Sequence, residues 1–361
     1  MKYIDEFSNP WSARAVLGEI AKLSRDKGAL TFMEVCGTHT AAARRHSIHQ
    51  ILPDSVKLIS GPGCPVCVTP IRDIDLFVAL ASRPDVIFAT FGDLIRVPGS
   101  AMSLEQARTQ GADVRIMYSP LDAIKIARQN PSCNVVFPAV GFETTAPTFA
   151  ACIQAAKSEG IKNFFIVPAN KTMPGAMRWL LDSGDIKIDG FMCPGHVSIV
   201  IGMKPYHALA EKYGMPFVVA GFEPLDILSA IKVLIESAGR SAVENTYSRV
   251  VKEEGNVKAR TVMSEVFEEC DSEWRGLGVI PGSGLALREE YHAFDAIHAL
   301  PVELPDPKPE PAGCMCGAIL RGTARPGDCR FFGEACRPDS PIGPCMVSTE
   351  GACATYYKYG T

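Results

Sequence analysis

The sequence predicts an α/β protein with two parallel-sheet domains, flanked by helices and facing a cleft, and a helical or irregular iron–sulfur domain at the C-terminal end. Between residues 29 and 238, short apolar segments alternate with helical ones, a pattern typical of parallel sheets covered by helices on both faces. Further along, six of the 13 cysteines lie between Cys314 and Cys353, among glycines and prolines that disfavour regular structure.

The first part of the chain predicts a helix and connection over 1–28, followed by a first α/β domain over 29–130. Apolar segments indicate its strands, and amphipathic spacing indicates its helices. The predicted strands span 29–35, 56–60, 85–90 and 113–118, and the predicted helices span 71–82 and 119–128.

The same alternation repeats over 131–238, which is the predicted second α/β domain, and the remainder, 239–361, is the third. The predicted strands of the second domain span 134–137, 163–167, 190–192 and 216–220, with a helix ending at 158 and another over 227–237. Beyond them we expect helices over 243–254 and 259–270, a turn-rich segment over 276–284 and an extended proline-rich connector over 300–311.

Composition excludes several classes of function. A net charge of −4 provides no basic surface for nucleic acid, and no apolar run is long enough to span a bilayer. The first residues lack the pattern of a signal peptide, so we expect a cytoplasmic protein. Disulfides are rare in a reducing compartment, and 13 cysteines therefore indicate metal binding or redox chemistry. Four scattered thiols lie mostly in apolar surroundings, where a buried inert thiol is expected: Cys133, Cys152, Cys193 and Cys270. Cys193 is a partial exception, because it directly precedes Pro194-Gly195-His196.

The spacing of the C-terminal cysteines favours an iron–sulfur cluster. Four of them are separated by 14, 6 and 16 residues, and Cys316 and Cys345 are left over. Soft thiolates on irregular loops suit a 4Fe-4S cluster, whereas structural zinc prefers two close pairs of ligands. Zinc remains the alternative. The four spaced cysteines are Cys314, Cys329, Cys336 and Cys353.

Two further motifs place thiols directly after predicted strands. In Cys36-Gly-Thr-His39 a helix N-terminus would lower the pKa of the thiol and favour the thiolate. There are two alternatives. One is a plain helix cap with a surface His39, and the other is a papain-like nucleophile, for which no third member of a catalytic triad can be identified. Cys64 and Cys67, on a Gly/Pro turn, suit a metal or a reversible disulfide, unless the pair is a chance spacing.

Polar residues at other strand ends are expected to face the same cleft, because ligands bind outside the carboxyl ends of parallel strands. Glu143 and His196 are the main candidates, although each could simply hydrogen-bond backbone groups. Neither a phosphate-binding loop nor a dinucleotide fingerprint occurs, so a classical nucleotide site is not supported.

Taken together, six motifs closely resemble those of the HypD family of hydrogenase maturation factors, in order and over nearly the full length. They are Cys36-Gly-Thr-His-Thr, Gly61-Pro-Gly-Cys-Pro-Val-Cys, Gly92-Asp-Leu-Ile-Arg-Val-Pro-Gly-Ser, Gly141-Phe-Glu-Thr-Thr-Ala-Pro, Pro194-Gly-His-Val-Ser and the cysteine tail. The resemblance implies two α/β domains and a third that holds a 4Fe-4S cluster. It also implies a stable complex with HypC, on which the Fe(CN)2CO group of nickel–iron hydrogenase is assembled. Cyanide would be transferred by a transient partner, HypE, after HypF makes it from carbamoyl phosphate.

Carried over to this sequence, the resemblance implies a role for each motif. Cys36 would help to hold the iron, together with a cysteine of HypC, and Cys64 and Cys67 would be a redox-active pair. The cluster ligands would be Cys314, Cys329, Cys336 and Cys353. Cys316 and Cys345 would form a second dithiol beside the cluster, similar to the disulfide of ferredoxin:thioredoxin reductase. His39, Glu143 and His196 would line the cleft, with Glu350 as a further candidate.

Two rival functions use the same residues. The first is a freestanding iron–sulfur thiol–disulfide reductase, which would act without HypC. The second is an interaction hub whose cluster is structural, for which Cys64→Ser would be silent. Whether the chain has redox or ligand-transfer activity of its own is left open by the sequence.

Overall fold

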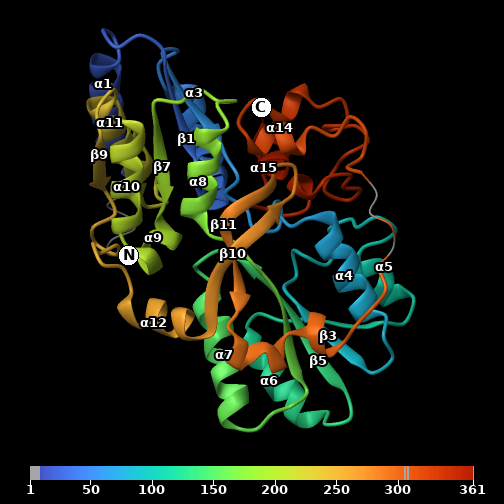
Figure 1. Cartoon of the computed structure of the whole chain (residues 1–361). Helices are drawn as coiled ribbons and strands as arrows, with labels where there is room; N and C mark the ends of the chain where they lie inside the picture. The colour runs from blue at the N-terminus through green and yellow to red at the C-terminus, as the bar shows by residue number, and fades with distance from the viewer. Residues whose placement is uncertain (1–8, 305, 307–308, 361) are drawn as a thin grey trace.

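The computed structural model describes residues 9–304, 306 and 309–360, so the first eight residues of the predicted 1–28 segment and part of the proline-rich connector lie outside it. Two parallel sheets, here called sheet A and sheet B, and one antiparallel hairpin carry the architecture (Figure 1). The α/β class with two parallel sheets and an irregular cysteine-containing end is confirmed.

Sheet A has five strands in the order β2-β1-β7-β8-β9. Its strands are β1 (Leu30–Glu34), β2 (Val56–Ser60), β7 (Gly190–Pro194), β8 (Pro216–Ala220) and β9 (Ala242–Asn245). All neighbours pair in parallel, with Leu30 opposite Val56 in the first pair and Pro194 opposite Ala220 in the third. The carboxyl ends of the strands therefore meet at one edge.

Sheet B has four parallel strands in the order β4-β3-β5-β6. They are β3 (Val86–Thr90), β4 (Asp113–Ile116), β5 (Asn134–Gly141) and β6 (Phe164–Asn170). Burial explains their composition, since β3 is buried at every position and seven of the eight residues of β5 are buried. Such runs of apolar residues are expected for strands covered on both faces.

Helices cover both faces of each sheet. The α1, α2, α3 and α11 helices pack with one face of sheet A, and α6 and α7 pack with one face of sheet B. A third apolar core lies between the sheets, where α4, α5, α8 and α10 meet the cysteine tail. The bounds are α1 Pro10–Leu23, α2 Gly37–Arg45, α3 Ile48–Ile51, α4 Ile71–Ala81, α5 Leu104–Thr109, α6 Pro120–Gln129, α7 Ala146–Ser158, α8 Met173–Asp182, α9 Gly195–Ile201, α10 Lys204–Tyr213 and α11 Pro224–Ser237.

The sheets do not follow the consecutive domains 29–130 and 131–238 expected from the sequence. The chain builds β1 and β2 of sheet A, crosses to sheet B for β3 to β6, and returns to sheet A for β7 to β9. Each expected domain therefore contributes strands to both sheets. The physical reason is that strand–helix alternation fixes parallel pairing but leaves the order of the strands open.

The region after sheet A also differs from the expected run of helices. The segment 243–254 contains β9 and turns, and the expected helix over 259–270 is α12 (Val257–Val266) followed by a strand. That strand, β10 (Phe267–Trp274), pairs with β11 (Gly278–Leu287), which includes most of the expected turn segment. Glycines in β11 masked the strand pattern, and Gly284 is needed because a Cβ there would lie 2.6 Å from that of Ser272.

After β11 the chain consists of short elements joined by turns. The first two, η2 (Glu289–Phe294) and α13 (Ala296–Ala299), pack against β6 of sheet B. The C-terminal tail follows, with α14 (Cys316–Leu320), η3 (Pro326–Asp328), η4 (Pro344–Met346) and α15 (Ala352–Tyr359). The tail lies against α2 and the face of sheet A that carries Met33 and Ile59, where Gly322 lets the backbone approach closely (Figure 1). The cysteines at the end of the chain are thereby brought to the motifs at its start.

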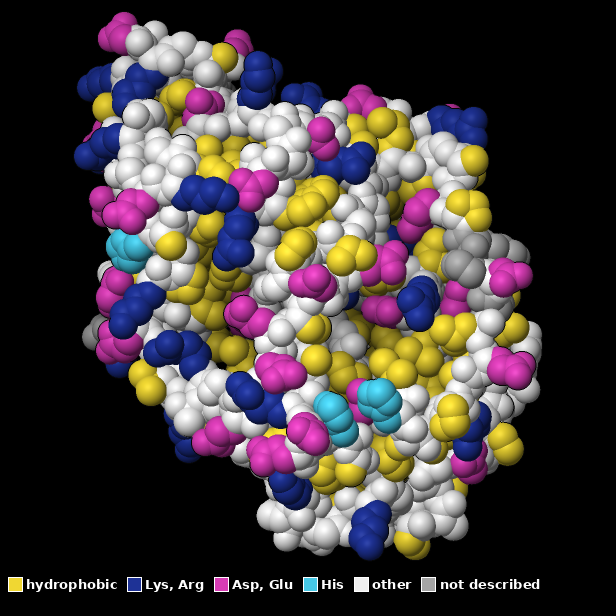
Figure 2. All heavy atoms as spheres, viewed as in Figure 1, with side chains coloured by type: hydrophobic (Ala, Val, Ile, Leu, Met, Phe, Trp, Pro, Cys, Tyr) yellow, Lys and Arg dark blue, Asp and Glu magenta, His cyan; other side chains and the backbone are white. Residues whose placement is uncertain are grey.

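The surface in Figure 2 intersperses cationic and anionic side chains, with apolar patches in its hollows and no single-sign field on this face. This pattern agrees with the small net charge of the sequence. In the part of the chain that the structure describes, no helix combines the length and hydropathy needed to cross a membrane.

Candidate functional site

Cys36 stands at the junction between β1 and α2, where it is the N-cap residue in an extended conformation (φ −148°, ψ 119°). Its main-chain N–H donates to Glu34 Oε2 at 3.1 Å. The next residue, Gly37, donates its N–H to the carbonyl oxygen of Gly63 at 2.9 Å. The loop after β2 therefore lies directly against Cys36, and a Cβ on Gly63 would come within 2.2 Å of the Cys36 nitrogen.

The Cys36 thiol is buried, and this burial decides its protonation. The N–H groups of His39 and Thr38, in the first turn of α2, lower its pKa as a helix N-terminus should. Burial has the larger effect and raises the pKa of Cys36 to about 12, with help from the carboxyls of Glu350 and Glu34. The expectation of a thiolate is therefore wrong for the free chain, in which Cys36 is a thiol at neutral pH.

Sequence reasoning missed Glu34, the last residue of β1, which is 1% exposed. Its carboxyl accepts hydrogen bonds from the Cys36 amide and from the Thr40 hydroxyl. Burial raises the pKa of Glu34 to about 8, and the hydrogen bonds from Thr40, Ser60 and Cys36 offset only part of this effect. An acidic residue at the end of an otherwise apolar strand was the signal that could have identified it.

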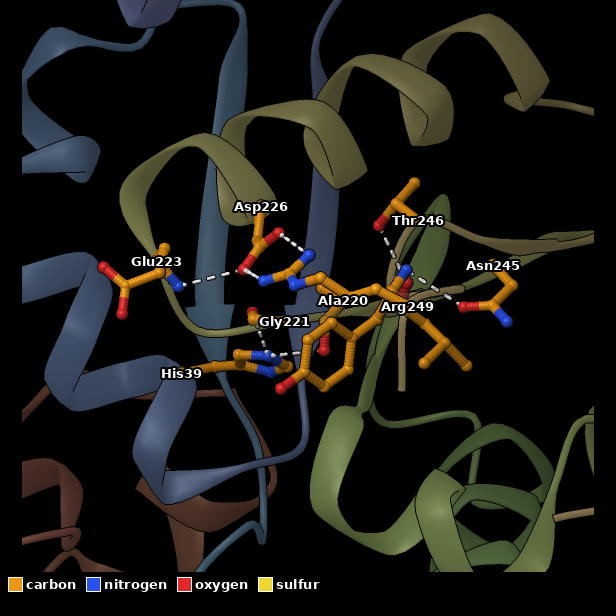
Figure 3. A network of polar contacts seen from close by, with 10 residues as sticks. His39, Ala220, Gly221, Glu223, Asp226, Asn245, Thr246 and Arg249 are labelled. Carbon is orange, nitrogen blue, oxygen red and sulfur yellow. Dashed lines mark hydrogen bonds and ion pairs between the residues drawn. The ribbon is translucent and has the colours of Figure 1, made fainter. Parts of the chain in front are cut away.

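His39 lies fully buried on α2 and points toward the backbone that follows β8 (Figure 3). Its Nε2 is 2.9 Å from the carbonyl oxygen of Gly221 and 3.3 Å from that of Ala220. Because carbonyl oxygens only accept, Nε2 carries the proton and Nδ1 has a free lone pair. Nδ1 has no hydrogen-bond partner among the described residues, and burial lowers the pKa of His39 to about 4. His39 is thus neutral at physiological pH.

An ion pair holds the loop that receives His39. Asp226, which is 1% exposed, pairs with Arg249 at 2.6 Å and also accepts the N–H of Glu223 at 3.2 Å. Figure 3 shows this pair beside the Gly221 carbonyl, so the backbone acceptors of His39 are fixed from both sides. The loop is therefore built to keep one tautomer and one orientation of the imidazole.

Phe222 connects His39 to His196, which sits in the first turn of α9. The Phe222 ring centroid lies 4.8 Å from that of His39 and 4.0 Å from that of His196, which stacks on it. Desolvation lowers the pKa of His196, whereas the charge of Glu350 raises it. His39 and His196 therefore both contact Phe222, a residue that the sequence had not singled out.

Glu350 brings the C-terminal tail to the same place. The Oε1 atom of Glu350 accepts a hydrogen bond from Thr38 Oγ1 at 2.6 Å. A Cβ added to Gly37 would lie 2.5 Å from the Cβ of Glu350. The Glu350 carboxylate also raises the pKa values of Cys36 and Asp93, although burial is the larger cause for both. Glu350 therefore faces α2, the loop after β3 and His196 together.

Glu143 follows β5 on sheet B and is 2% exposed. Its Oε1 accepts the N–H of Met173, the first residue of α8, at 2.9 Å, while Oε2 has no partner among the described residues. Burial raises the pKa of Glu143 to about 7. Asn170, at the end of β6, likewise has a buried Oδ1 without a described partner, and sequence reasoning had not singled it out.

A continuous series of thiols joins the loop after β2 to the tail. The Cys67 thiol lies beside those of Cys64 and Cys345, and its Sγ donates to the carbonyl oxygen of Pro344, which directly precedes Cys345, at 3.9 Å. Cys345, which is fully buried, is in turn in contact with Cys316 and Cys353. These donors lower the pKa of Cys345, and burial raises that of Cys67. Two cysteine groups that are almost 280 residues apart in sequence thus share one site.

The tail cysteines line a single apolar cavity together with phenylalanine, isoleucine and methionine side chains. The thiols that line it are those of Cys314, Cys316, Cys329, Cys336 and Cys353. Gly343 provides room for the sulfurs, because a Cβ there would lie 2.6 Å from Cys316 Sγ and 2.9 Å from Cys314 Sγ. All four cysteines predicted as cluster ligands therefore face one space, and Cys316 joins them.

The cysteines that line this cavity do not meet at one point. Within the described residues, no three His, Cys, Asp or Glu side chains converge on one metal-ion position. A 4Fe-4S cluster distributes four thiolates over four irons, so its ligands surround a volume rather than a point. Soft thiols around an apolar space are the ligands such a cluster uses.

The four scattered cysteines stay outside this network. Cys152 and Cys193 are fully buried in apolar cores, as expected for inert thiols. Cys133 and Cys270 are half-buried. Cys270 faces a polar cavity beside Lys171, so its surroundings are less apolar than the sequence suggested.

Comparison with known proteins gives one consistent result. A family model described as "HypD: Hydrogenase formation hypA family" matches residues 12–360. The chain is 46% identical over 371 residues to "Hydrogenase maturation factor HypD" of Rhodobacter capsulatus, covering 100% of this chain and 98% of that protein. It is 48% identical over 370 residues to the protein of that name from Rhizobium leguminosarum bv. viciae, covering 100% and 96% of the two chains. The Escherichia coli K12 protein of that name is 45% identical over 368 residues, covering 99% and 98%.

Proposed function

The chain belongs to the HypD family of hydrogenase maturation factors, and we propose that it is a scaffold on which the Fe(CN)2CO group is assembled, with Cys36 as its thiolate ligand. The iron unit is the cargo of this site. Cys36 is the thiol that lies among His39, Glu350 and the loop after β2. HypC is the proposed stable partner and would supply a second thiolate, while HypE would deliver cyanide.

The high pKa of the Cys36 thiol fits a ligand that becomes a thiolate only when iron binds. Iron would replace the thiol proton, since metal ligation requires the deprotonated sulfur. The proton then needs an acceptor nearby. The Glu350 carboxylate, whose charge acts on the Cys36 thiol, is the acceptor that we propose.

The residues of the tail fit a 4Fe-4S cluster, which we propose is held by Cys314, Cys329, Cys336 and Cys353. The support is the donor set, because all four thiols line one apolar cavity. When bound, such a cluster supplies one-electron transfer. Cys316 and Cys345 are then left as a dithiol next to it.

The observation that carries this proposal is the thiol contact between Cys345 and Cys67. It allows exchange between the tail dithiol and a Cys64–Cys67 disulfide. The Cys345 thiolate attacks the Cys67 sulfur, and Cys64 leaves as a thiolate. Cys316 then attacks Cys345, which forms the Cys316–Cys345 disulfide and releases the Cys67 thiolate. Two electrons pass from the tail pair to the pair that lies beside Cys36.

The experiment that tests this function compares two properties of the chain co-purified with HypC. Iron-bound CN⁻ and CO give infrared bands, while the cluster gives visible absorbance. We expect both in the wild-type complex. Absence of the CN⁻ and CO bands from a complex with a full complement of cluster would contradict the scaffold function.

The same thiol series would also serve a freestanding thiol–disulfide reductase. That function predicts turnover of a disulfide substrate by the chain alone, without HypC. The scaffold predicts negligible turnover, since the thiols of Cys64 and Cys67 are buried. A disulfide-reduction assay on the isolated chain distinguishes the two functions.

A further inference from the structure

The strand β2, at one edge of sheet A, borders a groove that none of the cysteines or candidate site residues described above lines. Two cavities of about 400 Å3 and about 330 Å3 lie along it and share Ile59, Arg325, Asp328 and Tyr356. They form one groove, here called the β2 groove. Its floor is β2 with Thr31 of the neighbouring β1, and its walls are α2 and α3, the tail over 319–328 and the segment 185–187 that precedes β7.

The backbone of β2 offers unpaired groups to this groove. In a parallel ladder, alternate residues bond to the same neighbour. The N–H of Leu30 donates to the carbonyl of Ser55, and the N–H of Gly61 donates to that of Glu34. Residues 55, 57, 59 and 61 therefore face β1, whereas Leu58 and Ser60 direct their N–H and C=O groups outward. No described strand pairs with this side of β2.

The groove carries an excess of positive charge. Its cationic residues outnumber its anionic ones by four to two, and burial lowers the pKa of His49, which keeps it neutral. The cationic residues are Arg44, Lys57, Lys187 and Arg325, and the anionic ones are Asp185 and Asp328. Asp328 is already engaged, because its Oδ2 accepts the N–H of Arg325 at 2.7 Å.

The two arginines are placed to receive a carboxylate. The Arg44 guanidinium lies 3.5 Å from the centre of the Tyr356 ring, which holds it against the groove. Within the described part of the chain, no carboxylate forms an ion pair with Arg44 or Arg325. Two arginines without an ion-pair partner inside the protein favour an external anionic group. Each planar guanidinium can donate two parallel hydrogen bonds to one carboxylate.

We propose that the β2 groove binds an extended acidic segment of a partner protein, which adds to sheet A as a further strand beside β2. Backbone hydrogen bonds to Leu58 and Ser60 would supply affinity, as in other cases of strand addition. Successive side chains would point alternately to the wall with Arg44 and to the wall with Arg325, so acidic residues at alternate positions would all face one of these arginines. This surface is separate from the thiol series, and its occupation does not require iron or cyanide.

The test uses two fluorescent ten-residue peptides with alternating valine, one with glutamate and one with lysine at the other positions. Fluorescence anisotropy is measured with the full chain containing its cluster. Leu58→Pro removes one outward N–H without touching the ladder to β1, and Leu58→Val is its control. Arg44→Gln with Arg325→Gln removes the charge, and Arg108→Gln, on the surface of α5, is the control.

We expect saturable binding of the glutamate peptide alone. Leu58→Pro and the double arginine variant should each weaken it about tenfold, which corresponds to roughly 1.4 kcal/mol, while both controls leave it unchanged. Circular dichroism establishes that each variant is folded. Absence of binding, equal binding of both peptides, or full binding by the folded double arginine variant would overturn the proposal. None of these results bears on the CN⁻ and CO bands.

Discussion

The amide of Gly37 donates a hydrogen bond to the carbonyl oxygen of Gly63 at 2.9 Å, and this bond joins the two cysteine motifs of the N-terminal half. The first turn of α2, which follows Cys36, is thereby fixed to the loop that carries Cys64 and Cys67. Because Cys67 contacts Cys345, the tail, the loop and α2 meet in one region.

Gly63→Ala should separate the two motifs. The added Cβ would lie 2.2 Å from the Cys36 nitrogen and 2.4 Å from its Cα, and backbone atoms have little freedom to move. We expect a loss of about 2 kcal/mol or more in the free energy of unfolding, as for other overpacked positions. Gly327→Ala is the control, since its Cβ meets nothing within 4 Å. Equal stability of the two variants, by urea denaturation, would show that the loop does not pack on α2 this closely.

His39 should make the protein sensitive to mild acid. Its pKa is about 4 when folded, against 6.5 for an ordinary histidine, because burial disfavours the charged ring. Between these values the unfolded chain binds the extra proton, so stability is full above pH 6.5 and falls as the pH decreases toward 4.

Between pH 7 and pH 4, the free energy of unfolding of His39→Gln should fall by roughly 3 kcal/mol less than that of wild type. This difference follows from about 1.36 kcal/mol for each unit by which the pKa of His39 differs between the folded and unfolded chain. Urea denaturation across this range measures the difference. His207→Gln, at an exposed pair with Glu253, is the control and should follow wild type. Parallel curves for wild type and His39→Gln would refute the buried neutral imidazole.

Cys336→Ser should lower the iron and sulfide content of the purified chain by a large fraction. The residue lines the cavity with the other proposed cluster ligands, and serine is a poor ligand for a cluster. Cys270→Ser removes a half-buried thiol outside the cavity and should retain full content. Iron and acid-labile sulfide analysis provides the measurement. Loss of cluster in both variants, or in neither, would count against the proposed ligand set.

Cys64→Ser should abolish hydrogenase maturation while the cluster stays in place. Serine replaces the thiol by a hydroxyl of similar size, but it has no sulfur that could form a disulfide with Cys67. Hydrogenase activity in a strain that depends on the variant is the readout, and Cys133→Ser is the matched control away from the site. Normal activity with Cys64→Ser would favour the interaction hub over the redox relay.

Much of the fold follows from local pattern, but its topology does not. The strands over 56–60 and 216–220 have the expected bounds, because apolar runs between turn residues are determined locally. The interleaving of sheets A and B depends on which strands pair, and that depends on contacts distant in sequence. The β10–β11 hairpin was missed because its strands alternate charged residues or contain glycine.

The candidate site shows the same division. Residue type and position identified Cys36, His39 and the tail cysteines, because grouped thiols, and an imidazole close to a thiol, indicate metal or redox chemistry. Glu34 and Phe222 were missed, because their importance comes from what folding places beside them. The pKa of Cys36 was predicted in the wrong direction because a helix N-terminus is visible in a sequence, whereas complete burial is a property of the assembled fold.

The most direct test of the proposed function is infrared spectroscopy of Cys36→Ala co-purified with HypC, together with its visible absorbance. We expect cluster absorbance to stay at the wild-type level, because Cys36 is not among the cysteines that line the tail cavity. We also expect the bands of iron-bound CN⁻ and CO to disappear. Persistence of those bands in the purified Cys36→Ala complex would show that another group holds the iron.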